Sequence, residues 1–131
     1  LKCWGGSRLG YSDLTQLNAP DAAAVNLGAG RTAKAVSAGD GHTCVILDDD
    51  TLKCWGQNRY LGYGSTSGDT DAPKTTAVNL GSGRTAKSVS LQYQHTCAIL
   101  DDDTVKCWVM AITPNSGTVA PAPNTLLLRV P

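Results

Sequence analysis

The feature that most constrains this chain is an internal repeat. Residues 25–56 and 78–109 align without a gap at an offset of 53, and 23 of the 32 positions are identical. The end of a third copy is present at the start of the chain, because Trp4, Trp55 and Trp108 are spaced by 51 and 53 residues. A period near 50 residues predicts one supersecondary unit per repeat, with neighbouring units stacking to bury a shared core.

The residue types favour short strands over helices. All eleven acidic residues are Asp, and the chain has fourteen Gly and six Pro. Asp, Gly and Pro favour turns and caps, whereas Glu, which is absent, is a good helix former. We therefore expect few helices.

Four short strands are expected in each repeat. In the first full repeat the first three cover residues 35–37, 42–47 and 51–56, a longer loop covers residues 57–72, and residues 73–80 lead into the fourth. Apolar residues occur on both faces of the central hairpin, which suits a sheet packed between two neighbours. The two apolar sets are Val45, Leu47 and Trp55 on one face and Ile46 and Leu52 on the other. This is the pattern of a β-propeller blade.

The central motif resembles that of the regulator-of-chromosome-condensation repeats. In both copies a His-Thr pair opens an apolar strand, an Asp turn follows, and the next strand ends in Trp; the copies begin at His42 and His95. The resemblance covers residues 1–109, and the variant with Cys in both strands is similar to secreted bacterial and microalgal members. It implies an all-β fold: a partial β-propeller of two to three four-stranded antiparallel blades with a non-repeat C-terminal tail.

The repeat divides the chain into four parts. We expect the end of one blade plus a loop in residues 1–24, a repeat blade in 25–77, a partial blade in 78–109, and an extended tail or linker in 110–131. The tail begins where the repeat is lost, at Val109, and it contains an Ala-Pro run. Two blades and the end of a third cannot close a ring alone, so we expect this chain to be processed or a fragment.

Four of the five cysteines are expected to form two disulfides. In a hairpin whose turn pairs Leu47 with Thr51, the two cysteines of a repeat face each other, within the range that a disulfide tolerates. The predicted pairs are Cys44–Cys54 and Cys97–Cys107. The alternative is buried reduced thiols. Disulfides would indicate an extracellular location or another oxidising compartment, such as the secretory pathway or an organelle lumen, and they leave Cys3 without a partner.

Other motifs have structural explanations. His42 and His95 each precede a Cys by two residues, but a structural His bonded to nearby backbone is favoured over a zinc ligand. The Asp triplets at 48–50 and 101–103 are interpreted as solvated turns and not as calcium loops. Residues 28–33 match a dinucleotide fingerprint only by letter, because no helix is expected there. We therefore expect no cofactor, no metal and no enzyme activity.

The leading hypothesis for function is a non-catalytic protein-binding or assembly module, an accessory or scaffold part of a larger complex. Its partners would be other protein subunits or further propeller blades. Zero net charge does not favour nucleic acid, and no segment is apolar enough to span a membrane. Two alternatives remain: guanine-nucleotide exchange on a small GTPase, which the resemblance implies, and a carbohydrate-binding or enzymatic propeller fragment. A possible binding loop contains Asn58, Arg59, Tyr60 and Tyr63.

Overall fold

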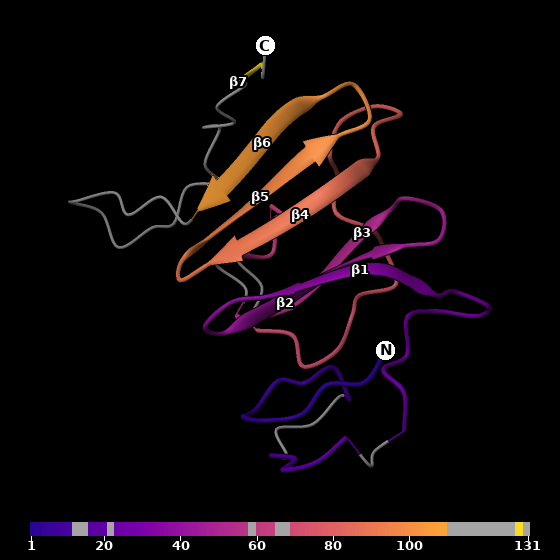
Figure 1. The fold of residues 1–131 in the computed structure, drawn as a ribbon, viewed down its shortest axis with the longest axis vertical. Helices are drawn as coiled ribbons and strands as arrows, with labels where there is room; N and C mark the ends of the chain where they lie inside the picture. The colour runs from indigo at the N-terminus through magenta and orange to yellow at the C-terminus, as the bar shows by residue number, and fades with distance from the viewer. Residues whose placement is uncertain (12–15, 21–22, 58–59, 65–68, 110–127, 130–131) are drawn as a thin grey trace.

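The chain folds into two stacked antiparallel sheets, shown in a computed structural model (Figure 1). The model describes residues 1–11, 16–20, 23–57, 60–64, 69–109 and 128–129. The first sheet has the order β1-β2-β3, and the second has the order β4-β5-β6-β7. The strands are β1 (Ala33–Ala38), β2 (His42–Leu47), β3 (Leu52–Gly56), β4 (Ala86–Gln92), β5 (His95–Leu100), β6 (Thr104–Val109) and β7 (Leu128–Arg129). The expected all-β fold is confirmed.

The two repeats form the same hairpin. In each, an Asp turn joins the second and third strands, and its last residue, Asp50 or Asp103, has φ near +60° (62° and 63°), a region that Asp tolerates better than most residues. Ile46 pairs with Leu52, which is the register predicted from the turn. No helix able to cross a membrane is found among the residues that the structure describes.

The expected fourth strand of the first sheet is not found: residues 73–80 form no strand, and the strand that follows them, β4, belongs to the second sheet. The edge of β3 that faces away from β2, its outer edge, instead makes separate hydrogen bonds with loop residues. The Val78 amide donates to the Leu52 carbonyl at 2.7 Å, and Gly56 exchanges two backbone hydrogen bonds with Thr70, at 2.7 and 2.9 Å. The backbone of β3 is thus satisfied without a continuous fourth strand.

A tyrosine hydroxyl closes the middle of the same edge. The Cys54 amide donates to the Tyr63 hydroxyl at 3.1 Å, and that hydroxyl donates to the Cys54 carbonyl at 3.3 Å. One phenol oxygen therefore acts as acceptor and donor, as a paired strand would. Burial raises the pKa of Tyr63, which keeps the proton on this oxygen.

The second sheet has a short fourth strand. Val105 pairs with Leu128 and Thr104 with Arg129, so β7 lies along the edge of β6. These two residues of β7 belong to the segment predicted to leave the propeller as a tail. Residues 110–127 and 130–131 of that segment lie outside the described residues.

The first sheet is packed on both faces, as predicted. Val45, Leu47 and Trp55 contact Val25 and Leu27 on one face. Ile46 and Leu52 on the other face contact the second sheet, in a core that is completed by a further group of residues. This group is Cys44, Cys54, Leu61, Val78, Leu80, Ala86, Leu91, Ala98 and Leu100. Figure 1 shows the second sheet lying against one face of the first and the N-terminal segment against the other.

Candidate protein-binding face

The first sheet shows how a repeat is covered by the next one. Five side chains of β2 and β3 point toward the second sheet, and each is at most 3% exposed. They are His42, Cys44, Ile46, Leu52 and Cys54. We call this set the covered face.

The second sheet has the equivalent side chains, and no further sheet covers them among the residues that the structure describes. Ile99 is 38% exposed and His95 is exposed, while the remaining three are half-buried. We call the set His95, Cys97, Ile99, Val105 and Cys107 the open face. Because the two faces are nearly identical in sequence, their difference in exposure comes from the sheet that covers one of them. Large apolar side chains left exposed in this way mark interaction surfaces.

A buried polar contact joins the two sheets. His42 Nε2 lies 2.8 Å from the Thr96 hydroxyl, which donates to the Tyr60 carbonyl at 3.0 Å. Because the hydroxyl proton is used by that carbonyl, Nε2 carries the proton and donates to Thr96. The sequence predicted a His bonded to nearby backbone; the partner is instead a side chain 54 residues away. The Leu91 amide also crosses between the sheets, donating to the Ser37 hydroxyl at 3.0 Å.

The environment of His42 favours the neutral imidazole. Burial lowers its pKa first, and the nearby charge of His95 lowers it further. The neutral form needs only one N–H, which Nε2 donates to Thr96. Nδ1 is buried and has no acceptor for a second proton within the described residues. Protonation at Nδ1 would place a charge where nothing compensates it.

We predict that the free energy of unfolding decreases as the pH falls below about 6.5. The folded-state pKa of His42 lies below that of the unfolded chain, so the unfolded chain binds more protons in this range and is favoured, by at most about 1.4 kcal/mol per pH unit. Urea unfolding between pH 5 and pH 8 measures the slope. His42→Gln should flatten it, and His95→Gln should flatten it less, because it removes only the weaker of the two causes that lower the pKa of His42. An unchanged slope in His42→Gln would contradict the assignment.

The proposed binding loop is only partly described. Asn58 and Arg59 lie outside the described residues, so their role stays a prediction. Tyr60 is 7% exposed, with its ring 5.2 Å from that of His42, and is not available to a ligand. The hydroxyl of Tyr63 is bound to β3, and Lys74 Nζ lies 4.7 Å from its ring centroid. Both tyrosines thus make contacts within the fold, and a binding role for this loop stays a prediction.

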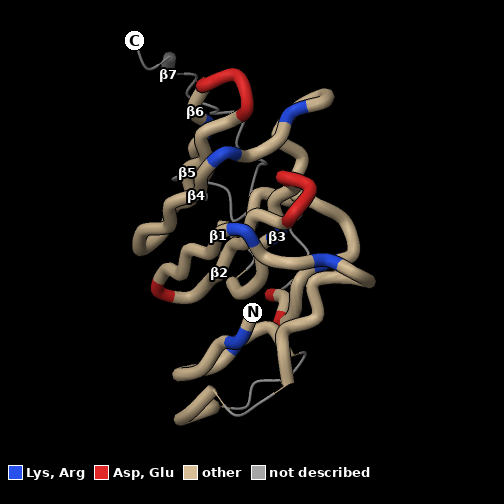
Figure 2. Tube along the Cα trace, turned by 45° about the vertical axis from the view of Figure 1, so that its right-hand side comes forward, with Lys and Arg blue, Asp and Glu red and all other residues tan. Residues whose placement is uncertain are grey.

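The Asp turns form ion pairs with basic residues of their own repeats. Figure 2 shows the position of the Asp turns in red and of the basic residues in blue along the chain. In the first repeat Arg31 lies 3.3 Å from Asp48 and 2.7 Å from Asp49, and Lys34 pairs with Asp50. The second repeat has the same pairs, formed by Arg84 and Lys87 with Asp101, Asp102 and Asp103. These exposed ion pairs add little to the stability of the fold, but they neutralise the negative charge of the Asp turns. The turns are solvated, as predicted.

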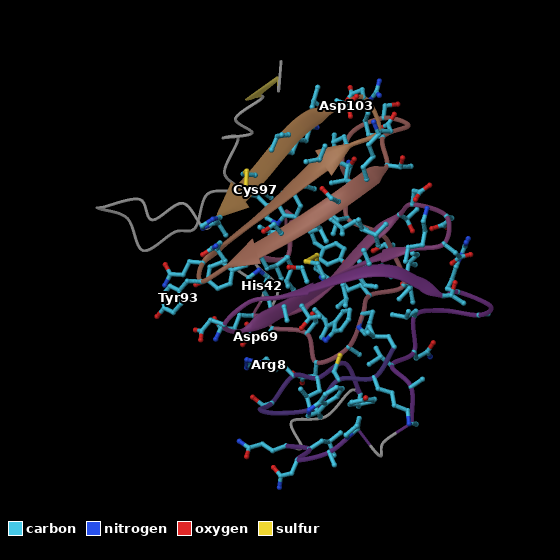
Figure 3. The ribbon with its side chains drawn as sticks, in the orientation of Figure 1. Arg8, His42, Asp69, Tyr93, Cys97 and Asp103 are labelled. Carbon is cyan, nitrogen blue, oxygen red and sulfur yellow. A yellow bond between two sulfur atoms is a disulfide. The ribbon has the colours of Figure 1, made fainter. Side chains whose placement is uncertain are left out.

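Two disulfides cross the hairpins. Cys44 bonds to Cys54 and Cys97 to Cys107, in the predicted register, with Cα–Cα distances of 4.1 and 4.0 Å. The first lies on the covered face and the second on the open face, where Cys97 is labelled in Figure 3. The fifth cysteine, Cys3, is a half-buried free thiol. Two disulfides are compatible with an oxidising compartment.

Comparisons with known proteins identify the repeat. Residues 33–61 match the family model of the regulator of chromosome condensation (RCC1) repeat. Human WBSCR16 has a similar structure, with a TM-score of 0.71 and 15% identity over 97% of this chain and 32% of that chain. So does Prp20p from Saccharomyces cerevisiae, whose structure was described with its binding to Gsp1p and histones: TM-score 0.68, 15% identity, 98% of this chain and 34% of that chain.

A third structure is yeast RCC1 (Prp20) bound to Kap60, with a TM-score of 0.51 and 18% identity over 60% of this chain and 18% of that chain. A search of curated proteins found no match. At these identities the structural likeness shows the fold. The chain spans about a third of the length of human WBSCR16, 32% of that chain.

Proposed function

Because the chain carries repeats of the regulator-of-chromosome-condensation type, we propose that it is a non-catalytic assembly module whose open face docks on a further repeat. The observation that supports this is the exposure of Ile99, 38% against 2% for the equivalent Ile46. In the first repeat, the equivalent face is buried by the sheet of the next repeat. The open face has nearly the same side chains, so it is suited to pack against a further repeat in the same way.

The groups of the open face specify what the docking surface should supply. Thr96 accepts a hydrogen bond from His42, so the equivalent His95 calls for a buried hydroxyl. Ser37 accepts a hydrogen bond from a backbone amide of the next sheet, so the equivalent Ser90, which is exposed and lies beside the open face, should accept one from the docking repeat. Ile99 and Val105 should make apolar contacts. A repeat with a Thr in the position of Thr96 would supply the hydroxyl, the amide and the apolar surface.

Two of the similar structures support protein binding as the general role. Yeast RCC1 (Prp20) was solved bound to Kap60, and the structure of Prp20p was described with its binding to Gsp1p and histones. These partners are properties of those proteins. For this chain the proposed partners are further blades or other subunits, in an extracellular or otherwise oxidising compartment. Catalysis forms no part of the proposal.

Ile99→Asp tests the open face. In the purified chain, other copies are the only source of repeats, so we expect concentration-dependent association through this face. A carboxylate at position 99 would have to be buried on docking, and it should weaken association at least tenfold, equivalent to about 1.4 kcal/mol. Sedimentation velocity over a range of protein concentrations measures this.

The control is Tyr93→Asp, which adds the same charge at a residue that is 67% exposed and lies in the turn between β4 and β5, outside the set of side chains that forms the open face (Figure 3). It should associate like the unmodified chain. A monomeric wild-type chain with a sharp cooperative melt would overturn the proposal, as would equal association of Ile99→Asp and Tyr93→Asp.

A further inference from the structure

The turn between β1 and β2 contains the dipeptide Asp40-Gly41. Asp40 is the one Asp of the chain that is followed directly by Gly. Because Gly has no side chain, its amide nitrogen can approach the side-chain carboxyl of the preceding residue more freely than the amide of any other residue can. The dipeptide is therefore suited to a reaction in which the Asp side chain closes onto the main chain.

Both reacting groups of this dipeptide are free. Asp40 is exposed, and within the described residues its carboxylate makes no hydrogen bond and no ion pair. The Gly41 amide has no hydrogen-bond partner among those residues either. Asp49, in the next turn, instead accepts hydrogen bonds from the amide and the hydroxyl of Thr51. Asp40 thus keeps the side-chain freedom that ring closure needs.

The main chain on either side of Asp40 is fixed. The Gly39 amide donates to the His42 carbonyl at 2.8 Å, which closes the turn. The Gln57 amide donates to the Gly41 carbonyl, also at 2.8 Å. An atom added to the main chain between these two bonds could not be accommodated without breaking one of them.

The second repeat has no such dipeptide. It has Gln92-Tyr93-Gln94 at the equivalent positions, where Gln92 pairs with His95 in the ladder of β4 and β5. The equivalent turn has neither a carboxylate nor a glycine, so it cannot undergo the same reaction. Figure 3 labels His42 and Tyr93 at the same end of the two sheets. The chain therefore contains its own control.

The turn that contains Asp40 also contacts the second sheet. A Cβ on Gly39 would lie 2.9 Å from Cε1 of His42 and 3.1 Å from the carbonyl oxygen of Gln92, in β4. The His42 ring is in turn bonded to the Thr96 hydroxyl at 2.8 Å. A displacement of the turn therefore moves groups that hold the two sheets together.

We propose that Asp40 is a site of spontaneous isoaspartate formation, and that this modification loosens the contact between the two sheets. The observations that carry the proposal are the free carboxylate and amide of Asp40-Gly41 and the position of Gly39 between the sheets. The inference is independent of the proposed assembly role, because it concerns a contact within the chain. The product would be a substrate for enzymes that methylate isoaspartyl carboxylates.

The reaction leaves the composition of the protein unchanged. The amide nitrogen of Gly41 loses its proton to water and attacks Cγ of Asp40, and the carboxyl releases one oxygen as water. In the resulting succinimide, water adds to the carbonyl carbon that came from the main chain. The bond from that carbon to the nitrogen breaks, and the carbon becomes a free carboxylate. The main chain then runs through Cβ and Cγ of residue 40 and is one atom longer.

Incubation of the purified chain at 37 °C and pH 6 tests the formation of the product. After reduction, trypsin releases residues 35–53 and 88–106, two peptides of equal length that each contain an Asp triplet. A protein-isoaspartate methyltransferase with radiolabelled S-adenosylmethionine then labels the product. We expect the label in the first peptide to exceed that in the second by about tenfold or more. Equal label in the two peptides would overturn the proposal.

Gly41→Ala tests the assignment to this dipeptide. A methyl group on residue 41 hinders the approach of its nitrogen to the carboxyl, so the label should fall by about tenfold or more. The atoms nearest to the new Cβ belong to the side chain of Gln57, which can rotate away. Gly6→Ala is the control, because a Cβ there meets nothing within 4 Å. Wild-type labelling of Gly41→Ala would show that Asp40 is not the site.

Hydrogen exchange of the Leu91 amide tests the effect on the contact between the sheets. This amide donates to the Ser37 hydroxyl of the first sheet at 3.0 Å, and nuclear magnetic resonance follows its exchange. We expect faster exchange in the incubated wild-type chain than in a fresh sample. Asp40→Ser cannot form the product, so its exchange should be the same before and after incubation. Unchanged protection of Leu91 in a chain that carries the label would overturn the proposed loosening.

Discussion

Gly56→Ala is expected to destabilise the fold by about 3 kcal/mol or more. The residue has φ +116°, which an L side chain rarely adopts, and the added Cβ would lie 2.3 Å from the Gly41 carbonyl oxygen. Both the strain and the overlap carry costs of about 1–3 kcal/mol. The overlapping atoms belong to the backbone, so no side-chain rotation can relieve the contact. Urea unfolding of the variant beside the unmodified chain measures the loss.

Gly64→Ala is the matched control. It also has a positive φ, +63°, but a Cβ there meets nothing within 4 Å. Only the backbone preference is lost, at about 1 kcal/mol. If the two variants lose the same stability, the close pairing of β3 with the start of β2 does not constrain position 56.

Removing the disulfide of the covered face should cost more than removing that of the open face. Both pairs are separated by 10 residues, so the loss of chain constraint is the same, about 3 kcal/mol for each. Cys44 and Cys54 are 0% exposed between two sheets, so their replacement by Ala also leaves a cavity, which we estimate to cost about a further 1–2 kcal/mol. Cys97 and Cys107 are only half-buried, and water can enter there.

The experiment compares the two double alanine variants. The unfolding midpoint should fall further for Cys44→Ala/Cys54→Ala than for Cys97→Ala/Cys107→Ala. The measurement is made on monomer, at a concentration below that of association, because docking would bury the open face. Equal losses under these conditions would contradict the difference in burial between the two faces.

The sequence predicted those features that depend on alternation along a strand. The aligned repeats placed a strand at residues 42–47, the bounds of β2. The same alternation placed Ile46 and Trp55 on opposite faces and Cys44 opposite Cys54. The strand bounds, the faces and the cysteine pairing all depend on residues within one hairpin, so the sequence of a single repeat is enough to predict them.

Contacts between repeats could not be predicted in this way. His42 binds a hydroxyl 54 residues away, and no local pattern identifies Thr96 as its partner. The fourth strand was predicted from the apolar residues of 73–80, of which Val78 and Leu80 are buried. They are buried as loop residues, and a tyrosine hydroxyl bonds the middle of β3 where a fourth strand would pair. Tyr60 was expected to be exposed because tyrosine occurs on surfaces as well as in cores, and only the position of the neighbouring sheet decides between these.

The tyrosine closure has a consequence for aggregation. An unpaired strand edge invites the edges of other chains, and proteins commonly protect such edges with charged residues or proline. Here a neutral hydroxyl occupies the amide and the carbonyl of Cys54 at once, so a foreign strand would have to displace Tyr63 before it could pair at that position. The tyrosine hydroxyl thus makes this edge of the hairpin a poor template for cross-β association, and it does so without a charge or a proline.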